Sequence, residues 1–100
     1  MTVNLQKDGT KLTLIVEGRL GTNTASELET VVKENIAGVT DLVYDFGKLE
    51  YIASAGLRIL LSSAKTMRKQ GTMKIIKVPE TVMDVFTFTG LVDVMDIEPA

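Results

Sequence analysis

The chain has 100 residues, with 45% hydrophobic and 24% charged side chains. This length suits one domain with a single sheet and a few helices, and the composition is ordinary for a soluble globular protein. A net charge of −2 and scattered basic residues argue against a nonspecific binder of nucleic acid or of membrane surfaces.

Cysteine and histidine are both absent from the chain. Disulfides, thiol chemistry and Ser-His couples are thereby excluded, and a zinc site would need carboxylates alone. No apolar run approaches the roughly 20 residues of a membrane span, and residues 1–4 lack the basic-then-apolar start of a signal peptide. We therefore expect a cytoplasmic protein without nucleic-acid or direct membrane contact, without a cofactor, and without enzymatic activity of its own.

The first part of the chain predicts a hairpin. Residues 3–7 alternate weakly between apolar and polar side chains, which favours an edge strand. Asp8 and Gly9 form a hairpin turn signal because both tolerate positive φ angles. Residues 11–17, which are rich in β-forming side chains, should therefore pair antiparallel with the first strand.

A helix is predicted next. Thr24 and Glu27 have the spacing of a capping box, in which two side chains satisfy free backbone donors at a helix start. The apolar residues that follow, Leu28 and Val32 among them, recur at helical spacing until Gly38 stops the pattern.

The middle of the chain predicts a strand, a loop and a second helix. Residues 41–46 should form the strand, and its run Leu42-Val43-Tyr44 is apolar on both faces, which is expected of a parallel strand covered by helices on both sides. Residues 47–53 should form the loop, and the helix should run from Ser54 to about residue 70, where Gly71 closes it.

Residues 73–78 predict another buried strand, and Pro79 opens a third helix that ends at Gly90. Residues 92–97 are either a last short strand or an extended tail. Strands that alternate with helices imply right-handed crossovers. The predicted fold is a single α/β domain with a mostly parallel sheet of four to five strands, an antiparallel edge strand and flanking helices.

Ser54 is the candidate functional residue because it is one hydroxyl at a predicted helix start, between two alanines and before a glycine. The simplest interpretation is an N-cap, in which the side-chain oxygen accepts a backbone N–H bond worth about 1 kcal/mol. Gly56 indicates a role beyond capping, since glycine in the first turn of a helix costs on the order of 0.5–1 kcal/mol relative to alanine. A close approach by another backbone or by a ligand would justify that cost.

A helix N-terminus also favours anions, so the domain would tolerate a phosphate on Ser54. That phosphate would add roughly −1.5 to −2 charges at the place where a partner docks. On the predicted helix, Leu57, Leu60, Leu61 and Ala64 face the sheet, which places Ile59 on the outer face, flanked by Gly56 and Ser63. We expect this outer face to contact a partner.

Other chemical motifs are missing. The segment around Ser54 lacks the first glycine of G-x-S-x-G, and neither a P-loop nor G-x-G-x-x-G occurs. Asp41, Asp45 and Glu50 have no spacing that favours a metal site over ordinary polar roles.

Several blocks of the chain follow one familiar pattern: Val43-Tyr44-Asp45-Phe46, then Tyr51-Ile52-Ala53-Ser54-Ala55-Gly56-Leu57, supported by Val16-Glu17-Gly18-Arg19-Leu20 before Thr24-Ala25 and by Thr89-Gly90-Leu91. In these blocks the chain resembles the STAS domains and, within them, the bacterial anti-sigma factor antagonists. The resemblance covers essentially residues 1–100. It implies a small sheet flanked by helices, as predicted above from the residues.

The resemblance also implies a partner-switching role. In that scheme the dephosphorylated antagonist binds an anti-sigma factor that is also an ATP-dependent serine kinase, which frees the sigma factor for transcription. Phosphorylation of the serine at the position of Ser54 releases the kinase, and a cognate phosphatase resets the antagonist. ATP and the catalytic groups would then belong to the partner, which agrees with a chain that lacks histidine.

The candidate partner-binding residues lie at the start of the serine helix and in the turn before the first helix: Gly21, Thr22, Ala53, Ser54, Ala55, Gly56, Arg58, Ile59 and Ser63. Family members commonly carry an aspartate just before the serine, where this chain has Ala53, and many carry another at the position of Gly21. Two other function classes stay open. One is a STAS accessory module of a transporter or stress-signalling complex that is not phosphorylated, and the other is an enzyme or small-ligand binder that uses the helix N-terminus as an anion site.

Overall fold

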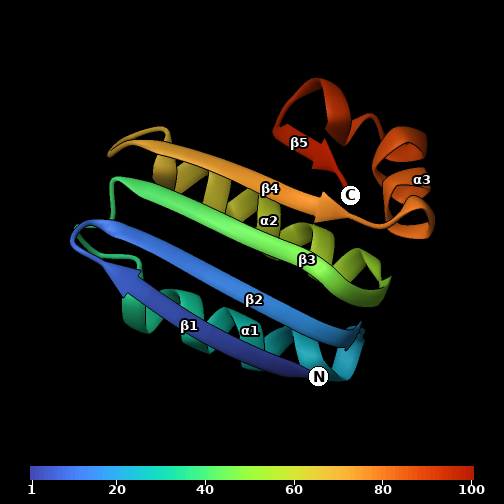
Figure 1. Cartoon of the computed structure of the whole chain (residues 1–100), viewed down its shortest axis with the longest axis horizontal. Helices are drawn as coiled ribbons and strands as arrows, with labels where there is room; N and C mark the ends of the chain where they lie inside the picture. Colours follow the sequence, from blue (N-terminus) through green and yellow to red (C-terminus); the bar gives the residue numbers. More distant parts are fainter.

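The computed structural model describes residues 1–100, which form one five-stranded sheet, three α-helices and a short 3-10 helix (Figure 1). The elements in chain order are β1 (Thr2–Asp8), β2 (Lys11–Leu20), α1 (Thr22–Asn35), β3 (Asp41–Ile52), α2 (Ser54–Met67), β4 (Thr72–Val78), α3 (Glu80–Thr89), η1 (Leu91–Asp93) and β5 (Asp96–Pro99). Within residues 92–97, Val92 and Asp93 end η1, and Asp96 and Ile97 begin β5, so the alternative of a last short strand is confirmed, with the strand shifted toward the C-terminus.

The strands lie in the sheet in their chain order, from β1 at one edge to β5 at the other. Strand β1 is antiparallel to β2, while β2, β3, β4 and β5 are mutually parallel. The predicted α/β fold with a mostly parallel sheet and one antiparallel edge strand is therefore confirmed.

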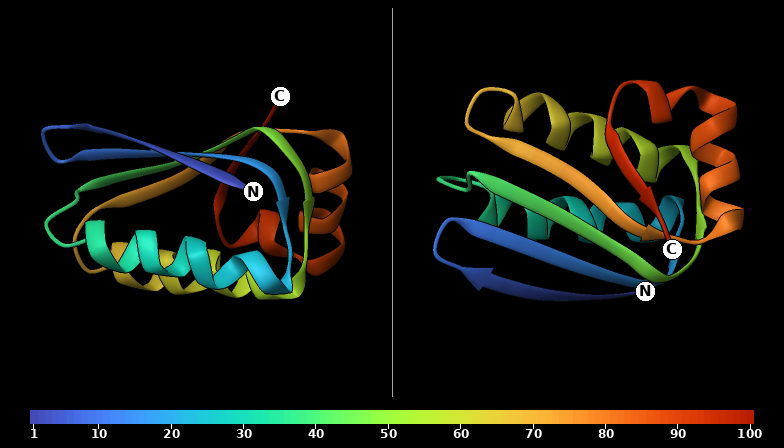
Figure 2. Two further views of the ribbon diagram at one scale, coloured as in Figure 1. Left: turned by 90° about the horizontal axis from the view of Figure 1, so that it is seen from below. Right: turned by 45° about the horizontal axis from the view of Figure 1, so that its top comes forward.

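The prediction that helices cover both faces of the sheet is wrong. Both α1 and α2 pack against the same face, and the opposite face carries no helix (Figure 2, left view). Leu42 and Tyr44 point toward the helices, whereas Val43 points to the bare face. Val43 is nevertheless 2% exposed, because it is paired across the sheet with Thr13 and Lys74, both half-buried. Neighbouring side chains, not a second helix layer, thus account for the apolar side chain at position 43.

Strand β3 is longer than predicted, and the loop expected at residues 47–53 is mostly strand. The pairing with β2 shifts register near Gly47 and again near Glu50, and it extends as far as Ile52, which lies opposite Leu20. Gly18 in β2 and Gly47 in β3 adjoin these shifts, so they lie at irregularities inside two long strands and do not end them. Carrying β2 and β3 on to Leu20 and Ile52 brings their ends together.

Helix α1 begins three residues earlier than the predicted capping box at Thr24 implies. Its N-cap is Gly21, and Thr24 is the third helical residue. The Gly21 N–H donates to Thr24 Oγ1 over 2.9 Å. Thr24 therefore serves the start of the helix from inside the first turn and is not the capping residue itself.

Helix α2 presents a different face to the sheet from the one predicted. The buried residues are Gly56, Ile59, Leu60, Ser63, Ala64 and Met67. Leu61, predicted to face inward, is 43% exposed, and Ile59, predicted to face outward, is 5% exposed. Two overlapping stripes of this helix share the same i, i+3, i+4, i+7 spacing, and the one with a serine and a glycine is the one that is buried.

Candidate functional site

The ends of β2 and β3 bring two helix N-termini side by side. Leu20 and Ile52 are neighbours in adjacent parallel strands, and each strand leads directly into a helix. The Ala53 N–H donates to the Leu20 carbonyl over 2.9 Å, which ties the start of α2 to the turn before α1. Gly21 and Thr22 at one helix start therefore lie close to Ala53 and Ser54 at the other.

Ser54 is the first residue of α2, and the N-cap position belongs to Ala53. The Ser54 side chain is exposed and forms no side-chain hydrogen bond, so its interpretation as a capping residue is wrong. The first backbone N–H groups of a helix have no partner within the helix, and they surround this hydroxyl with positive potential. The structure thus presents a free serine hydroxyl at an electropositive helix end.

Gly56 has a structural explanation inside the protein. A Cβ at this position would lie 2.8 Å from Leu20 Cγ and 2.9 Å from Ile52 Cγ1, both of which belong to the strand ends that precede the helices. Such contacts are shorter than any that normal packing allows. The close approach that glycine permits is therefore made by the core, not by a docked partner.

An open groove lies between α1 and α2. Its lining consists of Thr22, Ala25, Ser26, Glu29, Ala55, Arg58, Ile59 and Ser62. Ile59 contributes an apolar floor, whereas Arg58 and Glu29 bring opposite charges to the exposed walls. The predicted residues Thr22, Ala55, Arg58 and Ile59 are therefore brought together, although Ile59 lies at the base of the groove and not on an outer face.

A second hollow adjoins the same helix starts, lined by Arg19, Gly21, Thr22, Asn23, Thr24 and Tyr51. The Arg19 guanidinium lies 4.4 Å from the centre of the Tyr51 ring, within the range of a cation–π contact. Both side chains are exposed and are paired across β2 and β3. The sequence reading missed them because it took residues 47–53 as a loop, which hid their pairing.

Ser63 is buried, so its predicted place at the partner surface is wrong. Its hydroxyl donates to the Ile59 carbonyl over 2.8 Å, which leaves the Ser63 oxygen to accept from the Tyr44 hydroxyl at 2.7 Å. Burial raises the pKa of Tyr44 to about 12. Ser63 therefore provides the hydrogen-bond partner that the buried Tyr44 hydroxyl needs in the core.

None of the helices has the length and apolarity needed to cross a membrane. The chain also contains no group of three or more acidic side chains placed to hold a metal ion together.

A family profile described as the STAS domain matches residues 2–100. The chain belongs to the STAS domain family. Among curated proteins it is 29% identical to BtrV of Bordetella bronchiseptica, whose provisional name assigns it to the anti-sigma factor antagonists. That match covers 97% of this chain and 85% of BtrV.

Solved structures share the fold at low sequence identity. A Thermotoga maritima protein described as an anti-sigma factor antagonist has a TM-score of 0.90 at 17% identity, over 98% of this chain and 86% of the other. The Bacillus protein SpoIIAA in its phosphorylated form has a TM-score of 0.76 at 19% identity, over 96% and 90% of the two chains. SpoIIAA has also been solved in its unphosphorylated form.

Proposed function

We propose that this STAS domain is an anti-sigma factor antagonist that acts by partner switching. It binds an anti-sigma factor that is also a serine kinase, and ATP-dependent phosphorylation of Ser54 by that kinase releases it. A cognate phosphatase returns the domain to its binding form, and the exchange takes place in the cytoplasm. The chain itself is a regulatory binding module and performs no catalysis.

The observation that carries the proposal is the free Ser54 hydroxyl at the start of α2. An exposed hydroxyl that takes no part in capping can accept a phosphate without loss of a structural bond, and the helix end stabilises the added negative charge. The names of similar proteins agree, since BtrV is named as an antagonist and SpoIIAA is described in phosphorylated and unphosphorylated forms.

The proposed contact surface surrounds Ser54 on both helix starts. It comprises Gly21, Thr22, Ala53, Ala55, Arg58 and the Ile59 floor of the groove. A phosphate at Ser54 would add its charge at the edge of this surface, where a docked partner would have to desolvate it. Gly56 and Ser63 are buried beneath this surface and are not among its contacts.

The test combines the purified domain with its candidate anti-sigma factor kinase, ATP and magnesium, followed by intact-mass measurement. We expect one added phosphate, which is lost in Ser54→Ala and retained in Ser62→Ala, a neighbouring exposed serine of the same helix. Phosphate that persists in Ser54→Ala would refute the assignment of the site.

A second function rests on Ala53, which replaces the aspartate that the family commonly carries before the serine. In this alternative the domain is an accessory module of a transporter or stress-signalling complex and uses the same surface constitutively. Ser54→Asp separates the two functions, because a switch predicts weaker binding of the partner at an unchanged melting temperature. Binding that is insensitive to Ser54→Asp, with no phosphate found in cells, favours the accessory module.

A further inference from the structure

A small cavity lies at the opposite end of α2 from Ser54. Its volume is about 120 Å³, and its lining comprises Ala64, Met67, Arg68, Gly71, Met73, Val94, Met95 and Asp96. Helix α2, strand β4 and the segment from η1 to β5 each contribute to it. The exposed residues Gly71 and Val94 lie at its rim, so the cavity is accessible from solvent.

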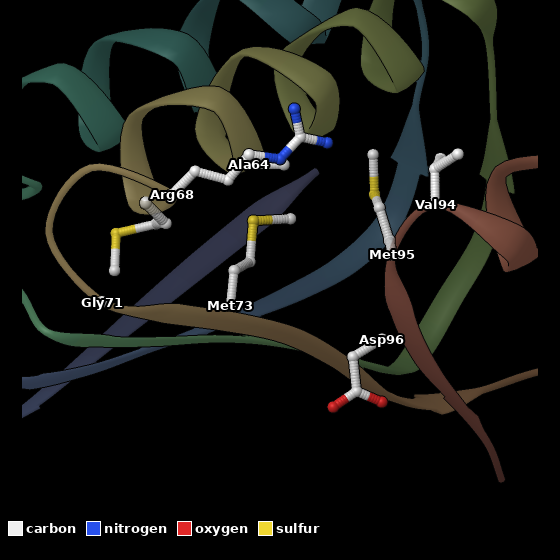
Figure 3. Close-up of a pocket in the computed structure, with 8 residues that line it drawn as sticks. Ala64, Arg68, Gly71, Met73, Val94, Met95 and Asp96 are labelled. Carbon is white, nitrogen blue, oxygen red and sulfur yellow. The ribbon is translucent and has the colours of Figure 1, made fainter.

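The walls are apolar and adaptable. Met73 from β4 and Met95 from the chain before β5 both reach toward α2, so that their thioethers border the same space (Figure 3). Methionine side chains are flexible and polarisable, and they adjust to ligands of irregular shape. An engineered cavity of roughly 150 Å³ holds benzene, so this smaller one suits a tail of about five carbon atoms and excludes nucleotides.

The rim supplies a positive charge. The Arg68 side chain runs along the top of the cavity, while the Asp96 carboxylate is turned away from it (Figure 3). The three ion pairs of the molecule involve Lys33, Lys48 and Lys77, so Arg68 is free to bind an anion.

The basic residues near Arg68 also favour an anionic ligand. Between Glu50 and Glu80 the chain contains no acidic residue, and Lys65 and Lys69 accompany Arg68 at the end of α2. These cations counter the negative dipole at the C-terminal end of α2.

From the apolar walls and the unpaired guanidinium, we infer that this cavity binds a small monocarboxylate with a short aliphatic tail. The tail occupies the space between Met67, Met73 and Met95, and the carboxylate pairs with Arg68 at the rim. The site is separate from the Ser54 surface, since the 14 residues of α2 span about 21 Å at 1.5 Å per residue.

The experiment is a titration with hexanoate, followed by NMR of protein labelled on the methionine methyl groups. We expect saturable shifts in the millimolar range for Met67, Met73 and Met95, and none for Met83, which lies on α3 outside the cavity. Absence of saturation, or equal shifts at Met83, overturns the proposal.

Variants test the charged rim and the apolar interior of the cavity separately. Arg68→Gln should weaken hexanoate binding about tenfold, since hydrogen bonds to charged groups are the stronger class. Lys69→Gln removes the same charge from the next exposed residue and should leave the affinity unchanged. Ala64→Leu should fill the cavity and abolish binding, with circular dichroism reporting that the chain is folded.

The uncharged analogue 1-hexanol tests the carboxylate contact, because it should bind more weakly and be insensitive to Arg68→Gln. Equal affinity for hexanol and hexanoate, equal effects of Arg68→Gln and Lys69→Gln, or wild-type binding by folded Ala64→Leu would each refute the inference.

Discussion

Ser54 and Gly56 are two residues apart on α2, yet their surroundings are opposite. The Ser54 hydroxyl meets solvent and forms no side-chain bond, whereas the Cα of Gly56 faces Leu20 and Ile52. The first position is therefore open to chemical change, and the second is closed to any side chain. Both properties follow from the way in which α2 starts directly at the end of β3.

Substitutions at these two positions should have very different effects on the free energy of unfolding. Ser54→Ala should change the free energy of unfolding by no more than about 0.5 kcal/mol, because no capping bond is lost. Gly56→Ala should cost about 1–3 kcal/mol, since its Cβ would lie 2.8 Å from Leu20. Urea denaturation measures both values, and a large loss in Ser54→Ala would show that the hydroxyl has a structural role.

Tyr44 makes stability depend on alkaline pH. Its pKa is raised from 10.0 to about 12 because the ring is buried. Below pH 10 the folded and unfolded chains both keep the phenolic proton, so the full stability is present. As the pH rises from 10 to 12, the unfolded chain loses this proton first, and the folded state becomes less stable by up to roughly 3 kcal/mol.

The matched variant is Tyr44→Phe, which removes the titrating group and keeps the Ser63 bond to the Ile59 carbonyl. Its unfolding free energy should fall less steeply between pH 10 and 12, as measured by denaturant titration at each pH. Parallel pH profiles for the two proteins would contradict the assignment of the loss to Tyr44.

At the scale of the element, α2 shows why periodicity alone did not define the buried face. The inward-facing stripe predicted from the leucines is shifted by one position along the chain from the observed stripe, and both stripes have helical spacing. The observed face buries Gly56 and Ser63 because the strand ends approach the first closely and Tyr44 needs a partner at the second. These are tertiary requirements, which a window of local sequence does not contain.

The orientation of α2 gives a direct mutational contrast. Leu60 is fully buried, and its replacement by alanine should cost about 2–5 kcal/mol. Leu61 is 43% exposed, and Leu61→Ala should cost less than about 1 kcal/mol. Thermal unfolding of the two variants measures the difference, and equal losses would show that the helix is rotated from the face described above.

Other elements were easier to predict because local chemistry dominates them. The hairpin turn, predicted at Asp8 and Gly9 and found one residue later at Gly9 and Thr10, and the end of α3 at Gly90 each need a positive φ angle, which Gly9 and Gly90 adopt. The start of α1 and the length of β3 were predicted wrongly. Pairing between β2 and β3 continues through residues whose local sequence is typical of turns and loops, and this pairing is not visible in the local sequence. Ser54 was found from its local context, whereas Arg19 and Tyr51 required knowledge of the pairing of β2 and β3.

At the scale of the whole molecule, the sheet has a stable centre and weaker edges. Strand β3 pairs on both sides and supplies Tyr44 and Phe46 to the core, whereas β1 is almost wholly exposed and β5 has four residues. Elements with few buried contacts open locally at lower free energy than the core.

Hydrogen exchange should follow this gradient. Amides within residues 42–46 of β3 should exchange only through global unfolding, whereas those of β5 should exchange considerably faster. Exchange measured residue by residue by NMR tests the expectation, with α1 as an internal reference of intermediate protection. Protection of β5 equal to that of β3 would contradict it.

The bare face of the sheet has a practical consequence. Gln6 on β1 is paired with Thr13 and therefore points to the side away from α1 and α2. The chain contains no cysteine, so Gln6→Cys would supply a single thiol for a fluorescent dye. A dye attached there would report the slower tumbling of a complex by anisotropy, while the sheet itself separates it from a partner docked on the helices.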